Sequence, residues 1–259
     1  MKKGYFGRCE SLGKIIAVAS GKGGTGKTTT VAAVSSCLAA LGYKTLAIDY
    51  DAGMNNLDFA LCMADFAVAD YLDVFNKRLS LMEACHEHPR IQNLFFLAAP
   101  ALYRPEENYV GVDRQILDEI RGTFDYCLID TPSGIGEGFR LAHKDADMSV
   151  IVTNGELPAI RDAQRAAETA REMGLGEVYL LVNRVKPGNY KRLHTTIDDV
   201  IDIVGTRLLG AVREDDSIML SLHENTPLIL YRKRRAAFDF LDIARRIRGE
   251  NIPLRRRYR

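Results

Sequence analysis

Gly21-Lys22-Gly23-Gly24-Thr25-Gly26-Lys27-Thr28 is the stretch of sequence that decides the fold. It follows an apolar, strand-like run, Lys14–Ser20, and precedes a helical pattern that continues to Leu41. Closely spaced glycines between a strand and a helix let successive backbone N–H groups point at a phosphate. In this G-x-x-x-x-G-K-[ST] pattern, Lys27 is expected to neutralise β- and γ-phosphate charge and the Thr28 hydroxyl to ligate Mg²⁺. The stretch therefore predicts a binding site for ATP and Mg²⁺.

Strand-like runs alternate with helical patterns along the whole chain. The runs are continuous stretches of apolar residues, which is typical of a parallel sheet covered on both faces. We expect strands at Lys14–Ser20, Thr45–Asp49, Leu94–Ala99, Tyr126–Asp130, Met148–Thr153, Val178–Asn183 and Leu208–Val212. We expect helices at Val112–Gly122, Leu157–Gly174, Thr196–Val204 and Ala236–Arg248. This alternation predicts an α/β fold of the P-loop type: a doubly wound, mostly parallel sheet with helices on both faces, in three layers.

The chain is short enough for one such domain. We expect an N-terminal extension over residues 1–13, a P-loop ATPase domain over residues 14–250 and a basic C-terminal tail over residues 251–259. The 35 basic and 34 acidic residues nearly cancel, so no global field attracts nucleic acid or membrane. From Arg232 onward, however, 11 basic residues face 3 acidic ones, a local charge of +8. That asymmetry is a signal about the C-terminal region, although a run such as Arg232–Arg235 is ordinarily a solvated loop.

The cysteines and the apolar runs indicate the compartment. Five dispersed cysteines without a C-x-x-C spacing argue against a disulfide framework or a zinc site, and for a reducing cytosol. The apolar runs are only as long as strands, so none is expected to span a membrane. We therefore expect a cytoplasmic protein.

Lys22, directly after the first glycine, distinguishes this loop from an ordinary P-loop. With it the loop resembles the deviant Walker A pattern, K-G-G-x-G-K-[ST]-[ST], of the MinD/ParA/nitrogenase-iron-protein superfamily. The resemblance extends from about Ile15 to Leu254 and implies that Lys22 reaches across a dimer interface to the partner's nucleotide, as an arginine finger does. The residues that it implies for ATP binding are Lys22, Gly23, Gly24, Thr25, Gly26, Lys27, Thr28 and Thr29.

Two acidic strand ends complete the expected phosphate site. Asp51 lies in the stretch Asp49–Asp58, which resembles the MinD pattern D-x-D-x-G-x-x-N-L-D, called switch I. That resemblance makes Asp51 the residue that positions the attacking water, although an acid at a strand end can also merely cap a helix. Asp130 ends the strand Tyr126–Asp130 and opens D-[ST]-P-[AS]-G-I, which resembles switch II of MinD. We expect Asp130 to hold a Mg²⁺-bound water in the Walker B manner.

Asn183 and Arg184 lie at another strand end, that of the expected strand Val178–Asn183. An asparagine can read adenine with both edges of its amide, and an arginine plane can stack on the base. Asn183 alone could also be a simple turn former, but the resemblance to MinD-like proteins implies that the pair holds adenine. Arg213 stands where that family has a proline, which puts base contacts from the Val212–Asp215 loop in question.

The resemblance implies an ATP-dependent homodimerisation switch. It would hydrolyse ATP to ADP and phosphate, take part in spatial positioning in cell division, and act with a protein activator or cargo. The alternative is a ParA-like partition ATPase whose basic C-terminal cluster binds DNA non-specifically. An iron–sulfur carrier would need a cysteine within Thr131–Phe139, where there is none. A small-molecule ligase on the same fold is disfavoured by Lys22 and the two switch patterns.

The basic C-terminal region is expected to contact a charged surface. We expect Phe238, Leu241 and Ile247 to pack the last helix on the domain. Arg255–Arg257 with Arg259 would then be free charge, able to make weak, salt-sensitive contact with anionic lipid at the inner face of the cell membrane. Of the five histidines, only His86 and His88 are close in sequence, and we expect them to face apart on a helix without a metal-binding or catalytic role.

Overall fold

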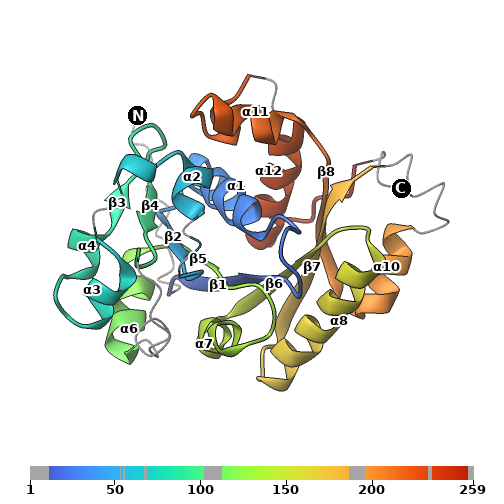
Figure 1. Cartoon of the computed structure of the whole chain (residues 1–259), viewed down its shortest axis with the longest axis horizontal. Helices are drawn as coiled ribbons and strands as arrows, with labels where there is room; N and C mark the ends of the chain where they lie inside the picture. Colours follow the sequence, from blue (N-terminus) through green and yellow to red (C-terminus); the bar gives the residue numbers. More distant parts are fainter. Residues whose placement is uncertain are drawn as a thin grey trace, which may run out of the picture.

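The structure, a computed structural model of the whole chain, describes residues 12–52, 54, 56–66, 69–101, 113–186, 196–232 and 235–255. The expected residues Gly53 and Asn55 of switch I, most of the N-terminal extension and the last four residues of the tail lie outside these ranges. Figure 1 shows a central sheet with helices above and below it.

The sheet has eight strands in the order β3-β4-β2-β5-β1-β6-β7-β8. They are β1 (Lys14–Ala19), β2 (Thr45–Asp49), β3 (His86–Glu87), β4 (Leu94–Leu97), β5 (Tyr126–Asp130), β6 (Met148–Thr153), β7 (Glu177–Val185) and β8 (Arg207–Arg213). Neighbouring strands are parallel except for β3 and β4, which are antiparallel. The expected doubly wound, mostly parallel sheet is confirmed. In its register, Val18 and Asp49 both lie beside Asp130, so two carboxylates meet next to the end of β1.

Helices cover both faces of the sheet (Figure 1). They are α1 (Lys27–Ala40), α2 (Leu57–Leu61), α3 (Tyr71–Phe75), α4 (Leu81–Ala84), α6 (Arg114–Thr123), α7 (Glu137–Lys144), α8 (Leu157–Glu172), α10 (Ile197–Val204), α11 (Ser217–His223) and α12 (Arg235–Ile247). Two short 3₁₀ helices, η1 (Ala64–Phe66) and η2 (Leu228–Leu230), join some of them. No helix among the described residues is both long and apolar enough to cross a bilayer.

The alternation of side chains along the central strands divides the core into layers. Ile16 and Val18 of β1 point into one cluster, which α1, α2 and α12 cover. Ile15 and Ala19 point to the other face, where α6 covers one half of the sheet and α8 with α10 covers the other half. Since both faces are buried, the strands can be apolar throughout, which explains why they read as continuous apolar runs.

One local expectation is wrong. His86 lies in β3, not on a helix; the chain there pairs with β4 through its backbone, and His88 is buried with Nε2 3.0 Å from the Leu61 carbonyl. The strand that was expected to end at Asn183 continues to Val185, through an irregularity in the pairing of β7 with β8. That irregularity places Arg184 at a φ of 53°, which turns its side chain out of the regular pleat.

The last helix also differs from the expectation. Ile247 is buried and Leu241 packs partly against the core, but Phe238 is 47% exposed, because the buried stripe of α12 runs through Ala236, Phe240, Ile243, Ala244 and Ile247. Nor is Arg255 a free charge. Its Nε lies 2.6 Å from Asp242 Oδ2, and its guanidinium lies over the Phe238 ring. The tail therefore begins as a segment held against α12; Arg256–Arg259 lie outside the described residues.

Candidate functional site

The phosphate loop connects β1 to α1 at the carboxyl end of the sheet. Gly24 and Gly26 have φ values of 81° and 94°, in the left-handed region that a side chain would disfavour. A Cβ on Gly26 would also lie 2.1 Å from Asn183 Nδ2, so only glycine fits there. Helix α1 begins at Lys27, and its N-cap Gly26 provides no side-chain hydrogen bond to its first N–H groups. Such a helix start is a ready-made site for a phosphate.

Lys27 lies at the centre of the acidic cluster. Its Nζ is 2.7 Å from Asp130 Oδ1 and 3.7 Å from Asp51 Oδ2, and the side chain is only 5% exposed. Burial raises the pKa of Asp130 above its ordinary value, while the Lys27 ammonium and the Thr28 hydroxyl oppose that shift. Burial likewise raises the pKa of Asp51, against the attraction of Lys27. One cation is thus shared by two carboxylates that would otherwise favour protonation.

Asp49 is a third carboxylate, and its role was not predicted from the sequence. One of its oxygens accepts the Asp51 N–H at 3.0 Å and the other accepts the Leu57 N–H at 3.2 Å, so it fixes both ends of the loop that carries Asp51. Burial, and then the neighbouring Asp130, raise the pKa of Asp49 to about 7. The signal was present in the sequence, because Asp49 ends an apolar strand in the same way as Asp130.

Lys22 lies apart from this cluster on the exposed rim of the loop. Its Nζ is 3.4 Å from Glu156 Oε2, just before α8, and both side chains are largely exposed. An exposed pair of this kind contributes little to stability, so Lys22 is not fixed to its own site. The remaining loop residues, Gly23 and Thr29, continue the backbone on either side of Lys27.

Asn183 joins β7 to the phosphate loop. Its Nδ2 donates to the Thr25 carbonyl at 2.8 Å, which orients the amide so that Oδ1 points elsewhere. That Oδ1 is buried and has no hydrogen-bond partner in the described part of the chain, and the same holds for Thr25 Oγ1. Buried acceptors without partners are rare in folded proteins and fit a ligand that supplies the donor. Arg184, the next residue, is exposed.

Arg213 is turned toward α12. Its Nε and Nη2 donate to the two Asp239 carboxylate oxygens at 2.9 and 3.1 Å, and Asp239 is itself buried. At this position, where the family has a proline, the guanidinium therefore forms an ion pair that ties the end of β8 to the last helix.

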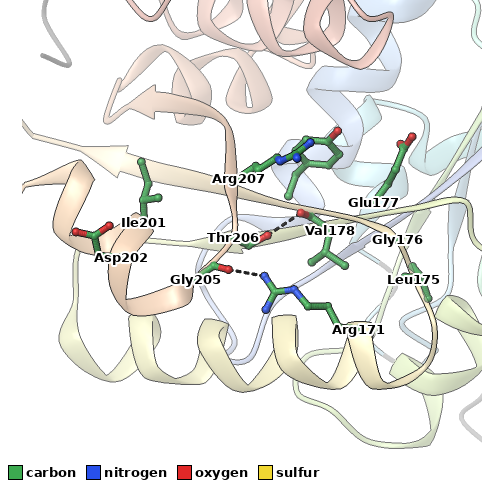
Figure 2. Close-up of a pocket in the computed structure, with 11 residues that line it drawn as sticks. Arg171, Leu175, Gly176, Glu177, Val178, Ile201, Asp202, Gly205, Thr206 and Arg207 are labelled. Atoms are coloured by element: carbon green, nitrogen blue, oxygen red, sulfur yellow. Dashed lines mark hydrogen bonds between the residues drawn. The ribbon is translucent and has the colours of Figure 1, made fainter.

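A hollow of about 710 Å³ lies at the opposite end of the sheet (Figure 2). It is bordered by the amino ends of β7 and β8 and by the ends of α8 and α10, where Arg171 donates to the Gly205 carbonyl at 2.7 Å. Since the phosphate loop is at the carboxyl end of β1, this hollow shares no residue with the site around Lys27. Ligands of doubly wound folds bind at the carboxyl ends of the strands, so we locate the candidate site at the loop.

Comparisons with known proteins identify the family of the chain. Residues 16–228 match the family of the CobQ/CobB/MinD/ParA nucleotide binding domain. The chain belongs to this family. It is 35% identical over 246 residues to the septum site-determining protein MinD of Thermotoga maritima, an alignment that covers 94% of this chain and 91% of that protein.

Solved structures of family members show the same architecture. A chain of the MinC:MinD cell division protein complex of Aquifex aeolicus superposes with a TM-score of 0.84 at 35% identity, over 94% of this chain and 98% of that one. The septum site-determining protein MinD of Pyrococcus horikoshii, complexed with Mg-ADP, superposes with a TM-score of 0.77 at 26% identity, over 91% and 96% of the two chains. The expected MinD/ParA membership is confirmed, and this chain is a MinD-like nucleotide-binding protein.

Proposed function

We propose that the chain is a MinD-like ATPase that dimerises with ATP, hydrolyses it to ADP and phosphate, and releases the dimer. The observation that carries this proposal is the buried contact of 2.7 Å between Lys27 Nζ and Asp130 at the end of a glycine-rich loop. A lysine and a strand-end aspartate in this arrangement are the parts that P-loop enzymes use for phosphates and Mg²⁺.

The loop and its neighbours fit ATP with Mg²⁺. Backbone N–H groups from Gly23 to Thr29 would bind the phosphate oxygens, and Lys27 would supply positive charge at the β- and γ-phosphates. The Thr28 hydroxyl and Asp130 would hold Mg²⁺, Asp130 through a water. Bound Mg²⁺ supplies positive charge that offsets both the phosphates and the carboxylates of Asp49, Asp51 and Asp130.

Hydrolysis needs a water in line with the γ-phosphorus. Asp51 would orient that water, whose oxygen forms the new bond to phosphorus as the bond to the β–γ bridging oxygen breaks. Asp49 would act as a positioning residue, because it holds the backbone of Asp51 and the start of α2. Lys22, exposed on the rim, would stabilise the charge that develops on the nucleotide of the partner subunit.

The base would lie against β7. Asn183 Oδ1, which has no hydrogen-bond partner among the described residues, is an acceptor, and the exocyclic amino group of adenine is a donor, so the two are complementary. The exposed Arg184 would stack on the base.

We propose that the dimer acts with a protein partner in positioning for cell division, and that it works in the cytoplasm and at the inner face of the cell membrane. The support is the family relationship to septum site-determining proteins, one of which is solved in a complex with MinC. Binding to DNA rather than to a membrane would instead indicate the ParA-like alternative. Sedimentation with anionic vesicles and, separately, with duplex DNA distinguishes the two surfaces.

Nucleotide titration tests the enzyme itself. Lys27→Ala should abolish binding of ATP with Mg²⁺ in calorimetry, and Thr28→Ala should weaken binding only when Mg²⁺ is present. Lys14→Ala, which removes the exposed ion pair of β1 with Glu177, serves as the matched control and should bind normally. Hydrolysis at the parental rate by Lys27→Ala would refute the proposed site.

A further inference from the structure

The segment Arg213–Ser217 leads from β8 into α11 beside the residue proposed for the base. In the sheet register, Arg213 lies opposite Val185, two residues after Asn183 in β7. The Glu214 N–H then donates to the Val185 carbonyl at 3.1 Å. The segment, which we call the β8–α11 segment, therefore leaves the sheet next to the end of β7. This is the edge of the sheet at which doubly wound folds bind their ligands.

Two carboxylates tie the β8–α11 segment to α12. Asp239, within α12, accepts hydrogen bonds from Arg213 Nε at 2.9 Å and Nη2 at 3.1 Å. The same carboxylate accepts the backbone N–H of Arg213 at 3.4 Å. Asp215, within the segment, accepts the N–H of Ala236 at the start of α12 at 2.9 Å and that of Ser217 at 3.0 Å. The position of the segment is therefore set by α12 as well as by the sheet.

The ion pair of Arg213 with Asp239 is largely shielded from water. The Asp239 side chain is 1% exposed and that of Arg213 is 15% exposed. A bidentate contact between a guanidinium and a carboxylate fixes the orientation of both groups, unlike an exposed pair of flexible side chains. A proline at this position, as in the family that the sequence resembles, would fix φ through its ring. Here the ion pair holds the same residue through its side chain and its backbone N–H.

Ser217, where the segment enters α11, supplies a second observation. It is 4% exposed, and its Oγ has no hydrogen-bond partner in the part of the chain that the structure describes. The same holds for Asn183 Oδ1 on the neighbouring strand. Buried polar atoms without partners are uncommon in folded proteins, and a ligand that supplies the missing partner is one explanation. The segment thus combines firm ties to α12 with an atom that fits contact with a ligand.

We propose that Arg213 is a positioning residue for the nucleotide base, because its ion pair with Asp239 holds the β8–α11 segment beside the base that Asn183 contacts. The inference rests on the proposed function for the location of that base. Arg213 itself contacts neither phosphate nor Mg²⁺, which belong to the loop around Lys27. The ion pair should therefore contribute to the affinity for a whole nucleotide but not to the affinity for its triphosphate part alone.

Calorimetry of the full chain with two ligands, ATP and inorganic tripolyphosphate, each with Mg²⁺, tests the proposal. The parent should bind ATP more tightly, because only ATP carries a base. Arg213→Gln should lower the affinity for ATP at least about tenfold and that for tripolyphosphate less than about threefold, since a released segment is in the binding position for only part of the time. The matched control is Arg255→Gln. It removes another arginine that pairs with Asp239, at 3.5 Å, and should bind both ligands like the parent.

A second variant guards against a loss of folding, because Arg213→Gln leaves the buried Asp239 without its closest partner. Arg213→Met with Asp239→Leu removes both charges, a change that folded proteins often tolerate, and should show the same selective loss. Circular dichroism checks that each variant is folded.

Four results would overturn the proposal. Parental affinity for ATP in the folded double variant would show that the ion pair does not act on the base. Equal losses for ATP and tripolyphosphate would show a general structural role. The same selective loss in Arg255→Gln would show an effect of charge near α12 rather than of the tie to Arg213. Equal affinities of the parent for the two ligands would show that the base is not held. A parent that binds neither ligand would instead refute the phosphate site of the proposed function, and this inference with it.

Discussion

Lys27 Nζ lies 2.7 Å from Asp130 Oδ1, and neither side chain is more than 5% exposed. Removing one member of a buried pair leaves the other without its counter-charge, which typically costs about 3–5 kcal/mol. Lys27→Ala should therefore lower the free energy of unfolding by roughly 3 kcal/mol in urea titrations near neutral pH. Lys22→Ala is a control from the same loop. Because its ion pair with Glu156 is exposed, Lys22→Ala should lower the free energy of unfolding by less than about 1 kcal/mol. Similar losses for both variants would show that the Lys27 pair contributes no more than a surface contact.

The raised pKa of Asp49, about 7, predicts how stability depends on pH. A carboxyl whose pKa is higher in the folded than in the unfolded state binds more protons when folded between the two values. Its contribution to stability is therefore present at low pH and is lost as pH rises from about 4 to about 7, with a slope on the order of 1 kcal/mol per pH unit. Asp49→Asn should remove this slope, so the parent and variant unfolding curves should converge or cross over that window. Parallel curves would mean that the pKa of Asp49 is not raised in the folded state.

Much of this site could be predicted from the sequence, because the loop is a local feature. A strand, closely spaced glycines and a helix start are adjacent in the chain, so they locate Lys27 and Thr28 without knowledge of the fold. Asp130 was also accessible, since an apolar strand that ends in an acid identifies it. The parallel sheet then brings such strand ends together.

What the sequence did not predict depends on contacts between distant segments. The buried hydrogen bonds of Asp49 need the return of the chain at Leu57, and the position of Asn183 within β7 depends on an irregular pairing with β8. The exposure of Phe238 follows from which stripe of α12 meets α1, and a list of apolar residues does not fix that stripe. The ion pairs of Arg255 were not predicted, because its partners Asp242 and Asp239 lie on α12 and the chain must turn back along that helix to meet them.

Asn183 Oδ1, for which the described part of the chain supplies no hydrogen-bond donor, predicts a preference for adenine. Adenine offers an amino donor at the position where hypoxanthine has a carbonyl, so ITP differs from ATP at the group that this oxygen would contact. ATP should bind more tightly than ITP by roughly 10- to 100-fold, the effect of leaving a buried acceptor unpaired. Asn183→Leu should remove this preference. Arg184→Ala should weaken both nucleotides alike, because stacking does not depend on the group at that position. Calorimetry with both nucleotides measures the ratio of the two affinities. Equal affinities in the parent would contradict a contact between Asn183 Oδ1 and the base.

The exposed position of Lys22 predicts activity that is shared between subunits. Lys22→Ala should bind ATP within about threefold of the parent, because the side chain does not belong to its own buried cluster, yet lose hydrolysis by at least about a hundredfold. Asp51→Ala should bind ATP and accumulate as a dimer in light scattering, because water attack is slowed. A mixture of these two inactive proteins should regain activity, since the Lys22→Ala subunit keeps Asp51 and receives Lys22 from its partner. A mixture of Asp51→Ala with the Lys22→Ala/Asp51→Ala double variant is the control and should stay inactive. If the first mixture is as inactive as its components, Lys22 acts within its own subunit and the shared site is wrong.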